Sequence, residues 1–174
     1  MIAIINASPL IYLGKIGAIT LLPKLFSTCY TTTIVKKEVL GYETVPEFLI
    51  LEDCFSDWLT VKNSSSKQLI KRLEDLQIHS GEASIIALGK EMQDKTEEII
   101  VIIDDLTARE IARTLELKIT GTLGIILKAL HQRLITKKEC KYFLQFLIEN
   151  TTFRISTNIF SKILKEIEKI NDRK

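Results

Sequence analysis

The stretch EEIIVIIDDLTAR, residues 97–109, decides the fold of this chain. We place a strand at residues 97–103, because a continuous apolar run is typical of a strand covered on both faces of a parallel sheet. Asp104 and Asp105 end this strand, and the residues that follow have the spacing of an amphipathic helix. A buried strand that leads directly into a helix is the building unit of parallel α/β sheets.

The rest of the chain repeats this alternation of short apolar runs and longer amphipathic stretches. Residues Ile2–Ile5 predict a first strand, after which Ser8 and Pro9 are expected to begin a helix that ends near Gly17. Thr33 is the expected cap of the next helix. Further strands are predicted at 27–32, 58–61 and 118–120, and helices at 33–40, 45–55, 68–78, 80–92, 106–117, from 122, and through the C-terminal third.

Composition is that of a globular, soluble protein. The 174 residues are 46% hydrophobic and 26% charged, and the net charge of +2 indicates no global field for a nucleic-acid partner. Three separated cysteines, Cys29, Cys54 and Cys140, predict reduced thiols rather than a disulfide framework or a zinc site. No apolar run is long enough to span a bilayer, so we predict a cytoplasmic protein without a membrane partner.

Polar and acidic residues follow the predicted strands at points that a parallel sheet brings together. Asn6 follows the first strand, Asp104 and Asp105 follow the long one, and Glu38 and Glu82 lie on helices that reach the same edge. Clustered carboxylates repel one another, and a hard divalent cation with oxygen ligands removes that cost. The pattern predicts Mg²⁺ or Mn²⁺ bound by Asn6, Glu82, Asp104 and Asp105, with Glu38, Glu82, Asp104 and Asp105 as the catalytic acids.

Each of these residues also has a structural interpretation. Aspartate at a strand-to-helix junction is a preferred helix cap, and Glu82 in a first helical turn is favoured by the helix dipole. Glu38 reads nearly as well as a solvated charge, and Asn6 as a turn residue. A cap needs one aspartate, however, and the adjacent pair of Asp104 and Asp105 favours the functional interpretation.

Four segments stand out in their order along the chain. They are IINASPLIYLGKIG (4–17), IVKKEVL (34–40), SGEASIIALG (80–89) and IIVIIDDLTAREIARTLELKITGTLGIILKA (99–129). Together they resemble PIN domains, and they are most similar to small prokaryotic PIN-like proteins related to the VapC ribonuclease toxins. The resemblance implies a PIN-like three-layer α/β fold, a central parallel sheet flanked by helices, in one domain over residues 1–174, with a core at 1–134 and a helical C-terminal extension at 135–174.

The resemblance also implies a toxin-like, metal-dependent endoribonuclease with a cognate antitoxin and a homodimer as further expectations. Asn6 takes the place of the first acidic ligand, Glu38 of the second and Glu82 of the third. Asp104 or Asp105 takes the place of the fourth, and the sequence does not choose between them. Asn6 is the departure, because an amide oxygen can ligate a metal but brings no charge. The alternative is a catalytically weakened or inactive module that binds nucleic acid or an antitoxin.

Basic and hydroxyl residues near the acidic set are the predicted contacts to RNA. Lys36 and Lys37 precede Glu38 on its helix, and Arg109 follows the aspartate pair. Thr122 opens a later helix, where it serves equally well as a cap. Lysines on helices are usually solvated charges, so the RNA role competes with that simpler interpretation.

Overall fold

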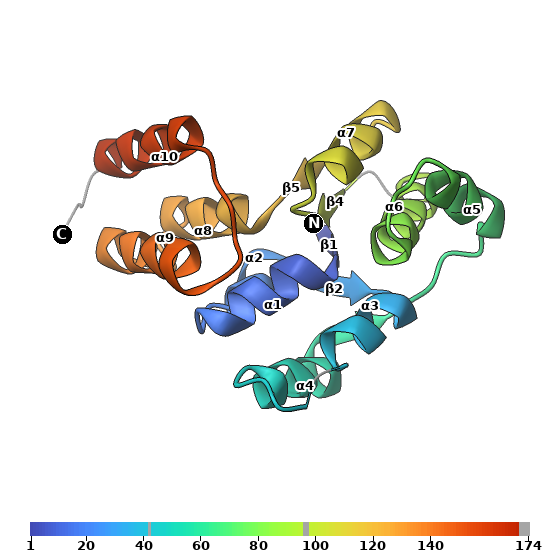
Figure 1. Cartoon of the computed structure of the whole chain (residues 1–174), viewed down its shortest axis with the longest axis horizontal. Coiled ribbons are helices and arrows are strands. Elements are labelled where there is room, and N and C mark those ends of the chain that lie inside the picture. Colours follow the sequence, from blue (N-terminus) through green and yellow to red (C-terminus); the bar gives the residue numbers. More distant parts are fainter. Residues whose placement is uncertain (42, 96–97, 171–174) are drawn as a thin grey trace. The chain divides into compact units, whose positions relative to one another are not determined.

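The computed structural model describes residues 1–41, 43–95 and 98–170 (Figure 1). The chain divides into two compact units, residues 1–122 and 123–174. We describe each unit on its own. No helix within the described ranges is both long enough and apolar enough to cross a membrane.

The first unit contains a five-stranded, all-parallel sheet, as the sequence predicts. Its strands lie in the order β3-β2-β1-β4-β5, so β1 occupies the centre. The apolar side chains of β1 and β4 are almost entirely buried, which is expected of central strands with helices on the sheet faces. The strands are β1 (Ile2–Ile5), β2 (Thr28–Thr31), β3 (Leu59–Val61), β4 (Ile99–Ile102) and β5 (Ile119–Thr120).

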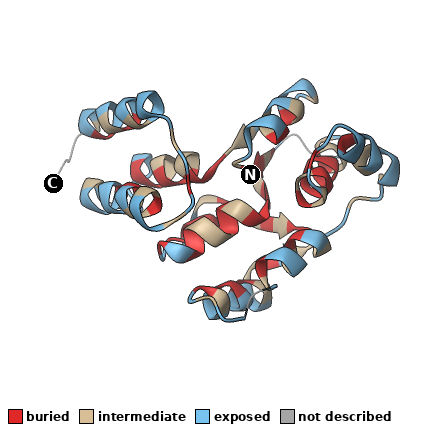
Figure 2. Ribbon diagram, in the orientation of Figure 1, coloured by how far each residue is buried: buried red, intermediate tan, exposed pale blue. Residues whose placement is uncertain are grey.

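Helices flank this sheet and connect its strands. α6 is the most buried of them, with nine of its 14 residues in the core, and it packs against β1 and β4 (Figure 2). Gly89 permits that approach, because a Cβ there would lie 2.7 Å from Val101 Cγ2. The helices are α1 (Ala7–Lys15), α2 (Leu21–Leu25), α3 (Thr33–Val39), α4 (Phe48–Asp57), α5 (Lys67–Asp75), α6 (Ser80–Gln93) and α7 (Leu106–Thr114).

The strand order reverses at β1. From β1 the chain runs outward to β2 and β3, and it then returns to place β4 on the other side of β1. Ile5 pairs with Ile102, and the backbone N–H of Asn6 donates to the Ile102 carbonyl at 3.0 Å. The residues that follow β1 and β4 therefore lie at a topological switch point, where parallel α/β sheets bind their ligands.

Several predicted boundaries were wrong. The first helix begins at Ala7 after Asn6, so Ser8 and Pro9 lie inside its first turn, where a missing proline N–H leaves no hydrogen bond unmade. Thr32, rather than Thr33, caps α3 by accepting from the Val35 N–H at 3.3 Å.

Other elements moved by a few residues or were missed. Helix α2 was not predicted, because five residues show no periodicity. α4 begins at Phe48 instead of residue 45. The strand predicted at 97–103 spans Ile99–Ile102, and Glu97 lies outside the described residues.

Three helices end on a non-glycine residue in the left-handed conformation. These residues are Gln77 (φ 64°), Glu116 (φ 62°) and Arg133 (φ 59°). At the first, the Gln77 N–H donates to the Glu74 carbonyl and the Ile78 N–H donates to the Leu73 carbonyl, and the other two ends repeat this pattern. This is the Schellman arrangement, in which glycine is the usual residue because it has no Cβ.

The second unit is helical, in agreement with the prediction for the C-terminal third. A capping box begins α9: Thr136 Oγ1 accepts from the Glu139 N–H, and the Glu139 carboxylate accepts from the Thr136 N–H. His131 and Glu166 connect α8 to α10 at 2.7 Å. The helices are α8 (Thr122–His131, whose first residue belongs to the first unit), α9 (Lys137–Asn150) and α10 (Thr157–Lys169).

All three cysteines are free and buried, as expected of reduced thiols. Burial raises the pKa of the Cys29 thiol to about 12 and that of the Cys140 thiol to about 11. Thiols with such pKa values are protonated at neutral pH and therefore poor nucleophiles.

Candidate active site

Asn6 presents a buried oxygen that has no hydrogen-bond partner among the described residues. Its side chain is 4% exposed, and although it occupies the N-cap position of α1 it makes no capping bond. Buried acceptors are nearly always paired, because leaving one unpaired costs about 1–3 kcal/mol. The Oδ1 atom is therefore suited to a ligand outside the protein chain.

Gly81 shows which group lies beside this oxygen. A Cβ built on Gly81, in the first turn of α6, would lie 3.6 Å from Asn6 Oδ1 and 3.1 Å from Glu38 Oε2. Two oxygens, one from the end of β1 and one from α3, therefore converge over the first turn of α6. A glycine at this position keeps the space between them open.

Glu82 adds a third oxygen donor to this region. It is half-buried, and burial, the Asp105 charge and, to a smaller extent, the Glu38 charge raise the pKa of its carboxyl, while His79 lowers it. The Glu82 carboxylate on α6 is thus repelled both by Glu38 on α3 and by Asp105 at the start of α7. Their mutual repulsion is the situation that a bound cation relieves.

A buried hydroxyl pair fixes α3 against α6. Thr32 Oγ1 and Ser84 Oγ lie 2.7 Å apart, and Ser84 Oγ donates to the Gly81 carbonyl at 2.6 Å. Because α3 carries Glu38 and α6 carries Glu82, this pair sets the relative positions of the two acids. Sequence reasoning missed it, although threonine at a helix cap and serine inside an apolar helix were visible signals.

The two adjacent aspartates have different surroundings. Asp105 is exposed and caps α7, since its Oδ1 accepts from the Ala108 N–H at 2.8 Å. Asp104 accepts from the Thr122 N–H through Oδ1 and from the Thr122 hydroxyl through Oδ2. Burial raises the pKa of Asp104, while Thr122 and the Arg109 charge lower it. Of the two, Asp105 is the aspartate whose charge acts on Glu82.

Gly121 allows Asp104 and Arg109 to approach the backbone closely. A Cβ on Gly121 would lie 2.6 Å from Asp104 Oδ1 and 3.1 Å from Arg109 Nη1. The Nε of Arg109 is buried and has no hydrogen-bond partner among the described residues. Sequence reasoning did not single out Gly121, although glycine directly before a helix-capping threonine is a signal of close packing.

The predicted RNA contacts differ in how accessible they are. Lys37 is exposed on α3, whereas Lys36 is half-buried with its Nζ 5.0 Å from the centre of the Phe55 ring. Thr122 is fully buried, and its hydroxyl is engaged by Asp104. Contact between Thr122 and RNA stays a prediction that requires this hydrogen bond to open.

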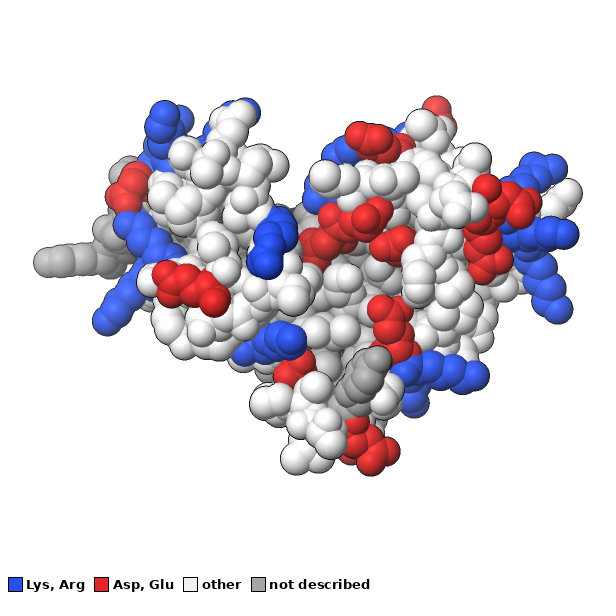
Figure 3. All heavy atoms as spheres, in the orientation of Figure 1, with Lys and Arg blue, Asp and Glu red and all other residues white. Residues whose placement is uncertain are grey.

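Acidic side chains gather on the surface in the region between α7, α6 and α3 (Figure 3). In the described part of the chain, no three His, Cys, Asp or Glu side chains are grouped closely enough to hold a metal ion. A cation here would therefore use the Asn6 amide oxygen and waters beside the carboxylates, which fits Mg²⁺ because it keeps several waters when bound. The donors are all oxygens, as hard cations require.

The reversed strand order and the polar residues that follow β1 and β4 define a parallel α/β domain with an acidic carboxyl edge. The family model DUF3368, whose description is PIN domain, matches residues 2–169, and this chain belongs to that family. PIN domains bind nucleic acids. No curated protein matches the chain.

Proposed function

We propose that this PIN domain is a metal-dependent endoribonuclease of the toxin-like kind, which hydrolyses RNA phosphodiester bonds. The observation that carries the proposal is the unpartnered Asn6 Oδ1. It faces the same space as Glu38 Oε2, in the region of the Glu82 carboxyl, whose pKa burial and, after it, the Asp105 and Glu38 charges raise. A buried amide oxygen without a hydrogen-bond partner, near carboxylates that repel one another, fits a site for Mg²⁺ or Mn²⁺.

We assign a hydrated cation to the space between Asn6, Glu38, Glu82 and Asp105, with bound waters between the metal and the carboxylates that are too far apart to ligate it together. Asp104 has both oxygens engaged by Thr122, so we assign it the role of holding the β4–α7 junction and the start of α8 in register. When bound, a divalent cation of this kind activates a water and neutralises charge on the phosphodiester. This assignment chooses between the two aspartates that the sequence left open.

The side chains at the acidic carboxyl edge of the sheet have distinct proposed roles in hydrolysis. Glu82, which we assign beside the cation, orients the attacking water by accepting a hydrogen bond from it. Lys37, exposed on the helix that carries Glu38, holds an RNA phosphate. Arg109 lies near Asp104 at the same edge, where its charge lowers the pKa of that carboxyl.

Cleavage of a labelled single-stranded RNA in the presence of Mn²⁺ tests the proposal. The parent should cleave, and Glu82→Gln, purified identically, should be slower by a factor of about 10² or more. EDTA should abolish cleavage by the parent. If Glu82→Gln cleaves as fast as the parent, the activity belongs to a contaminant or to another site, and the proposal is wrong.

A second candidate function is a weakened or inactive PIN module that binds nucleic acid or an antitoxin. Asn6 favours it, because an amide in the first ligand position gives the cation no charge. Calorimetry with Mn²⁺ separates the two: binding by the parent supports the enzyme, and binding that appears only in Asn6→Asp supports the weakened module.

Three further expectations come from the resemblance to toxin relatives. We propose a cognate antitoxin as a protein partner, a homodimer, and action in the cytoplasm. Light scattering of the purified chain, alone and with the product of a neighbouring antitoxin-like gene, checks the first two. Fractionation of cells that express a tagged chain checks the third.

A further inference from the structure

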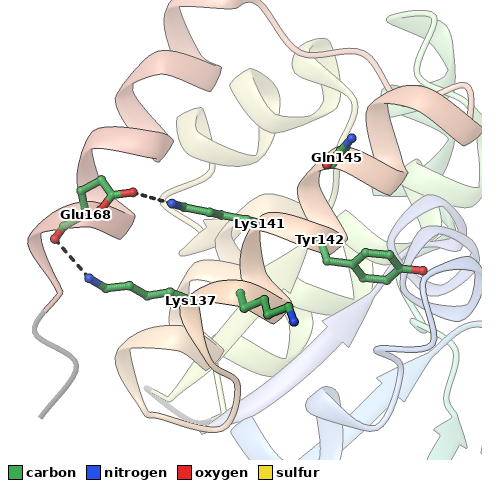
Figure 4. A pocket seen from close by; sticks show the side chains of 6 residues that line it. Lys137, Lys141, Tyr142, Gln145 and Glu168 are labelled. Atoms are coloured by element: carbon green, nitrogen blue, oxygen red, sulfur yellow. Dashed lines mark hydrogen bonds and ion pairs between the residues drawn. The ribbon is translucent and has the colours of Figure 1, made fainter.

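A cleft between α9 and α10 is lined by three lysines and one carboxylate. It has a volume of about 620 Å³, and it lies wholly within the second unit (Figure 4). Three lysines and an exposed aromatic ring are concentrated in it. Its lining residues are Lys137, Lys138, Lys141, Tyr142, Gln145 and Glu168.

The α9 side of this cleft is a single helical stripe. Lys138, Lys141, Tyr142 and Gln145 follow the spacing i, i+3, i+4, i+7, and all four are exposed. The stripe extends along α9 for about 10 Å, at 1.5 Å per residue. Because the opposite face of α9 supplies the core, these four residues are not needed for folding. The buried residues of that opposite face are Cys140, Leu144 and Leu147.

Only one carboxylate lines the cleft against the three lysines. Glu168 accepts a hydrogen bond from Lys141, and its backbone carbonyl accepts from Lys137 Nζ at 3.3 Å. Lys141 and Lys137 accordingly lower the pKa of the Glu168 carboxyl. Glu139, the nearby acid on α9, is occupied by the capping box with Thr136. The cleft therefore keeps an excess of positive charge, and Glu168 occupies the position that an external anion would take.

Tyr142 gives the cleft a flat apolar surface beside the lysines. Its ring is 57% exposed, and it packs at a tilt against Phe143 and Phe146, with centroids 6.1 Å and 6.0 Å away. Such tilted packing is a favourable aromatic arrangement and braces the ring in one orientation. Figure 4 shows this ring directed away from the Lys141 ammonium and from Glu168. An exposed ring on the same helix face as lysine side chains can stack one base of a strand whose phosphates the lysines hold.

We propose that this cleft binds single-stranded RNA outside the acidic edge. Lys138 and Lys141 contact phosphates, one base stacks on Tyr142, and Gln145 bonds to a base or ribose edge. Glu168 competes with the phosphates for Lys141 and weakens binding. The inference deepens the proposed nuclease function, because it names where the substrate is held beyond the cleavage site.

The chemistry of the cleft favours RNA over an acidic polypeptide. An acidic peptide would use the lysines and gain little from the face of Tyr142, since carboxylates do not stack. Single-stranded RNA uses both the charges and the ring. The contribution of the ring, measured apart from that of the lysines, therefore identifies the occupant.

Anisotropy of a short fluorescent single-stranded RNA, titrated with full-length protein in EDTA, tests the proposal. Lys138→Gln with Lys141→Gln should weaken binding by about tenfold and flatten the salt dependence by about 0.7 in slope per lost phosphate contact. Lys162→Gln with Lys165→Gln on α10 removes equal charge from exposed positions outside the cleft, and it should change the affinity little. Circular dichroism confirms that each variant is folded.

Substitutions at two further positions test whether binding can be strengthened as well as weakened, and they identify the ligand. Glu168→Gln should bind RNA more tightly, by up to about fivefold, because it removes a competing surface carboxylate. Tyr142→Leu should weaken binding by about tenfold, while Tyr142→Phe stays close to the parent because it keeps the ring. Equal losses in both lysine pairs would mean nonspecific attraction and overturn the proposal. Poly-glutamate that competes equally well, with no effect of Tyr142→Leu, would assign the cleft to an acidic polypeptide and overturn it as well.

Failure of the nuclease proposal would look different. EDTA keeps cleavage out of the binding measurement, and Glu82→Gln should bind RNA as the parent does. Binding that depends on the cleft in a chain that does not cleave with Mn²⁺ would refute the nuclease and leave the cleft assignment in place. Cleavage by a protein whose RNA binding is unaffected by the cleft variants would refute the cleft assignment and leave the nuclease proposal in place.

Discussion

Thr122 donates to both carboxylate oxygens of Asp104, from its backbone N–H at 2.8 Å and from its hydroxyl at 2.6 Å. The pair connects the second residue after β4 to the residue that begins α8. Because Thr122 is fully buried, water does not replace the hydroxyl if it is removed. Asp104 is thus held by the fold itself, and the exposed Asp105 faces the other acids.

Thr122→Val should destabilise the protein by about 1–3 kcal/mol, because it leaves a largely desolvated carboxylate oxygen without its donor. Thr122→Ser keeps the hydroxyl and should lie much closer to the parent. Urea denaturation monitored by circular dichroism measures both. A valine variant as stable as the serine variant would show that the hydroxyl bond contributes nothing.

Gly81→Ala should separate folding from metal binding. Alanine suits the first turn of α6 better than glycine does, and the exposed Glu38 side chain can move by the few tenths of an ångström that the new methyl requires. The metal-free protein should therefore gain up to about 1 kcal/mol. The new methyl group would lie 3.1 Å from Glu38 Oε2 and 3.6 Å from Asn6 Oδ1, in the space assigned to the cation. Thermal melts should therefore show a higher Tm without Mn²⁺ and a smaller upward shift with it. An undiminished shift would place the cation elsewhere.

Asn6→Asp should have opposite effects with and without a cation. Without one, it adds a buried carboxylate near Glu38 and should lower the Tm. With Mn²⁺, the added charge should tighten binding by about tenfold, equivalent to about 1.4 kcal/mol. Calorimetric titration with Mn²⁺ checks the second effect. Unchanged Mn²⁺ affinity would contradict the assignment of Asn6 as a ligand.

Glu91 should make stability depend on pH in the acid range. Hydrogen bonds from the Ser65 N–H, Lys95 and Ser64 lower the pKa of Glu91 to about 2. A lowered folded-state pKa stabilises the fold above the ordinary value of 4.5, and this contribution is lost as the pH falls toward 2. Glu91→Gln should cost about 1 kcal/mol at pH 7, allowing for partial exposure, and the difference should vanish near pH 2. A difference that is constant with pH would contradict this reasoning.

The fold was largely predictable because the decisive elements are long or strongly apolar. The apolar run before Asp104 predicts a buried strand, and the long segment that forms α6 predicts a helix. The sequence could not give the cap of the first helix, since both Asn6 and Ser8 are good cap residues and only the β1–β4 pairing places Asn6 at the boundary. Helix α2 is too short to show a period.

The sequence predicted which polar side chains follow the strands at this edge, and their membership and roles in a site stay predictions. The order of the strands sets the carboxyl edge, so Asn6 and the aspartate pair were found from the pattern alone. Which aspartate acts on Glu82 depends on the hydrogen bond between Thr122 and Asp104. The two residues are 18 positions apart, and their contact cannot be deduced from the sequence pattern. The partner of Lys36 is the Phe55 ring, 19 positions further along the chain, which is likewise a tertiary fact.

The left-handed residues at the ends of α5, α7 and α8 are positions where substitution by glycine should raise the stability of the protein. Glycine at Gln77, Glu116 or Arg133 would adopt the observed φ without the Cβ crowding that costs other residues about 1 kcal/mol. These positions end three separate helices, so their gains should combine. A background that carries all three glycines would tolerate destructive changes around the acidic edge, and activity could then be compared between proteins that all remain folded.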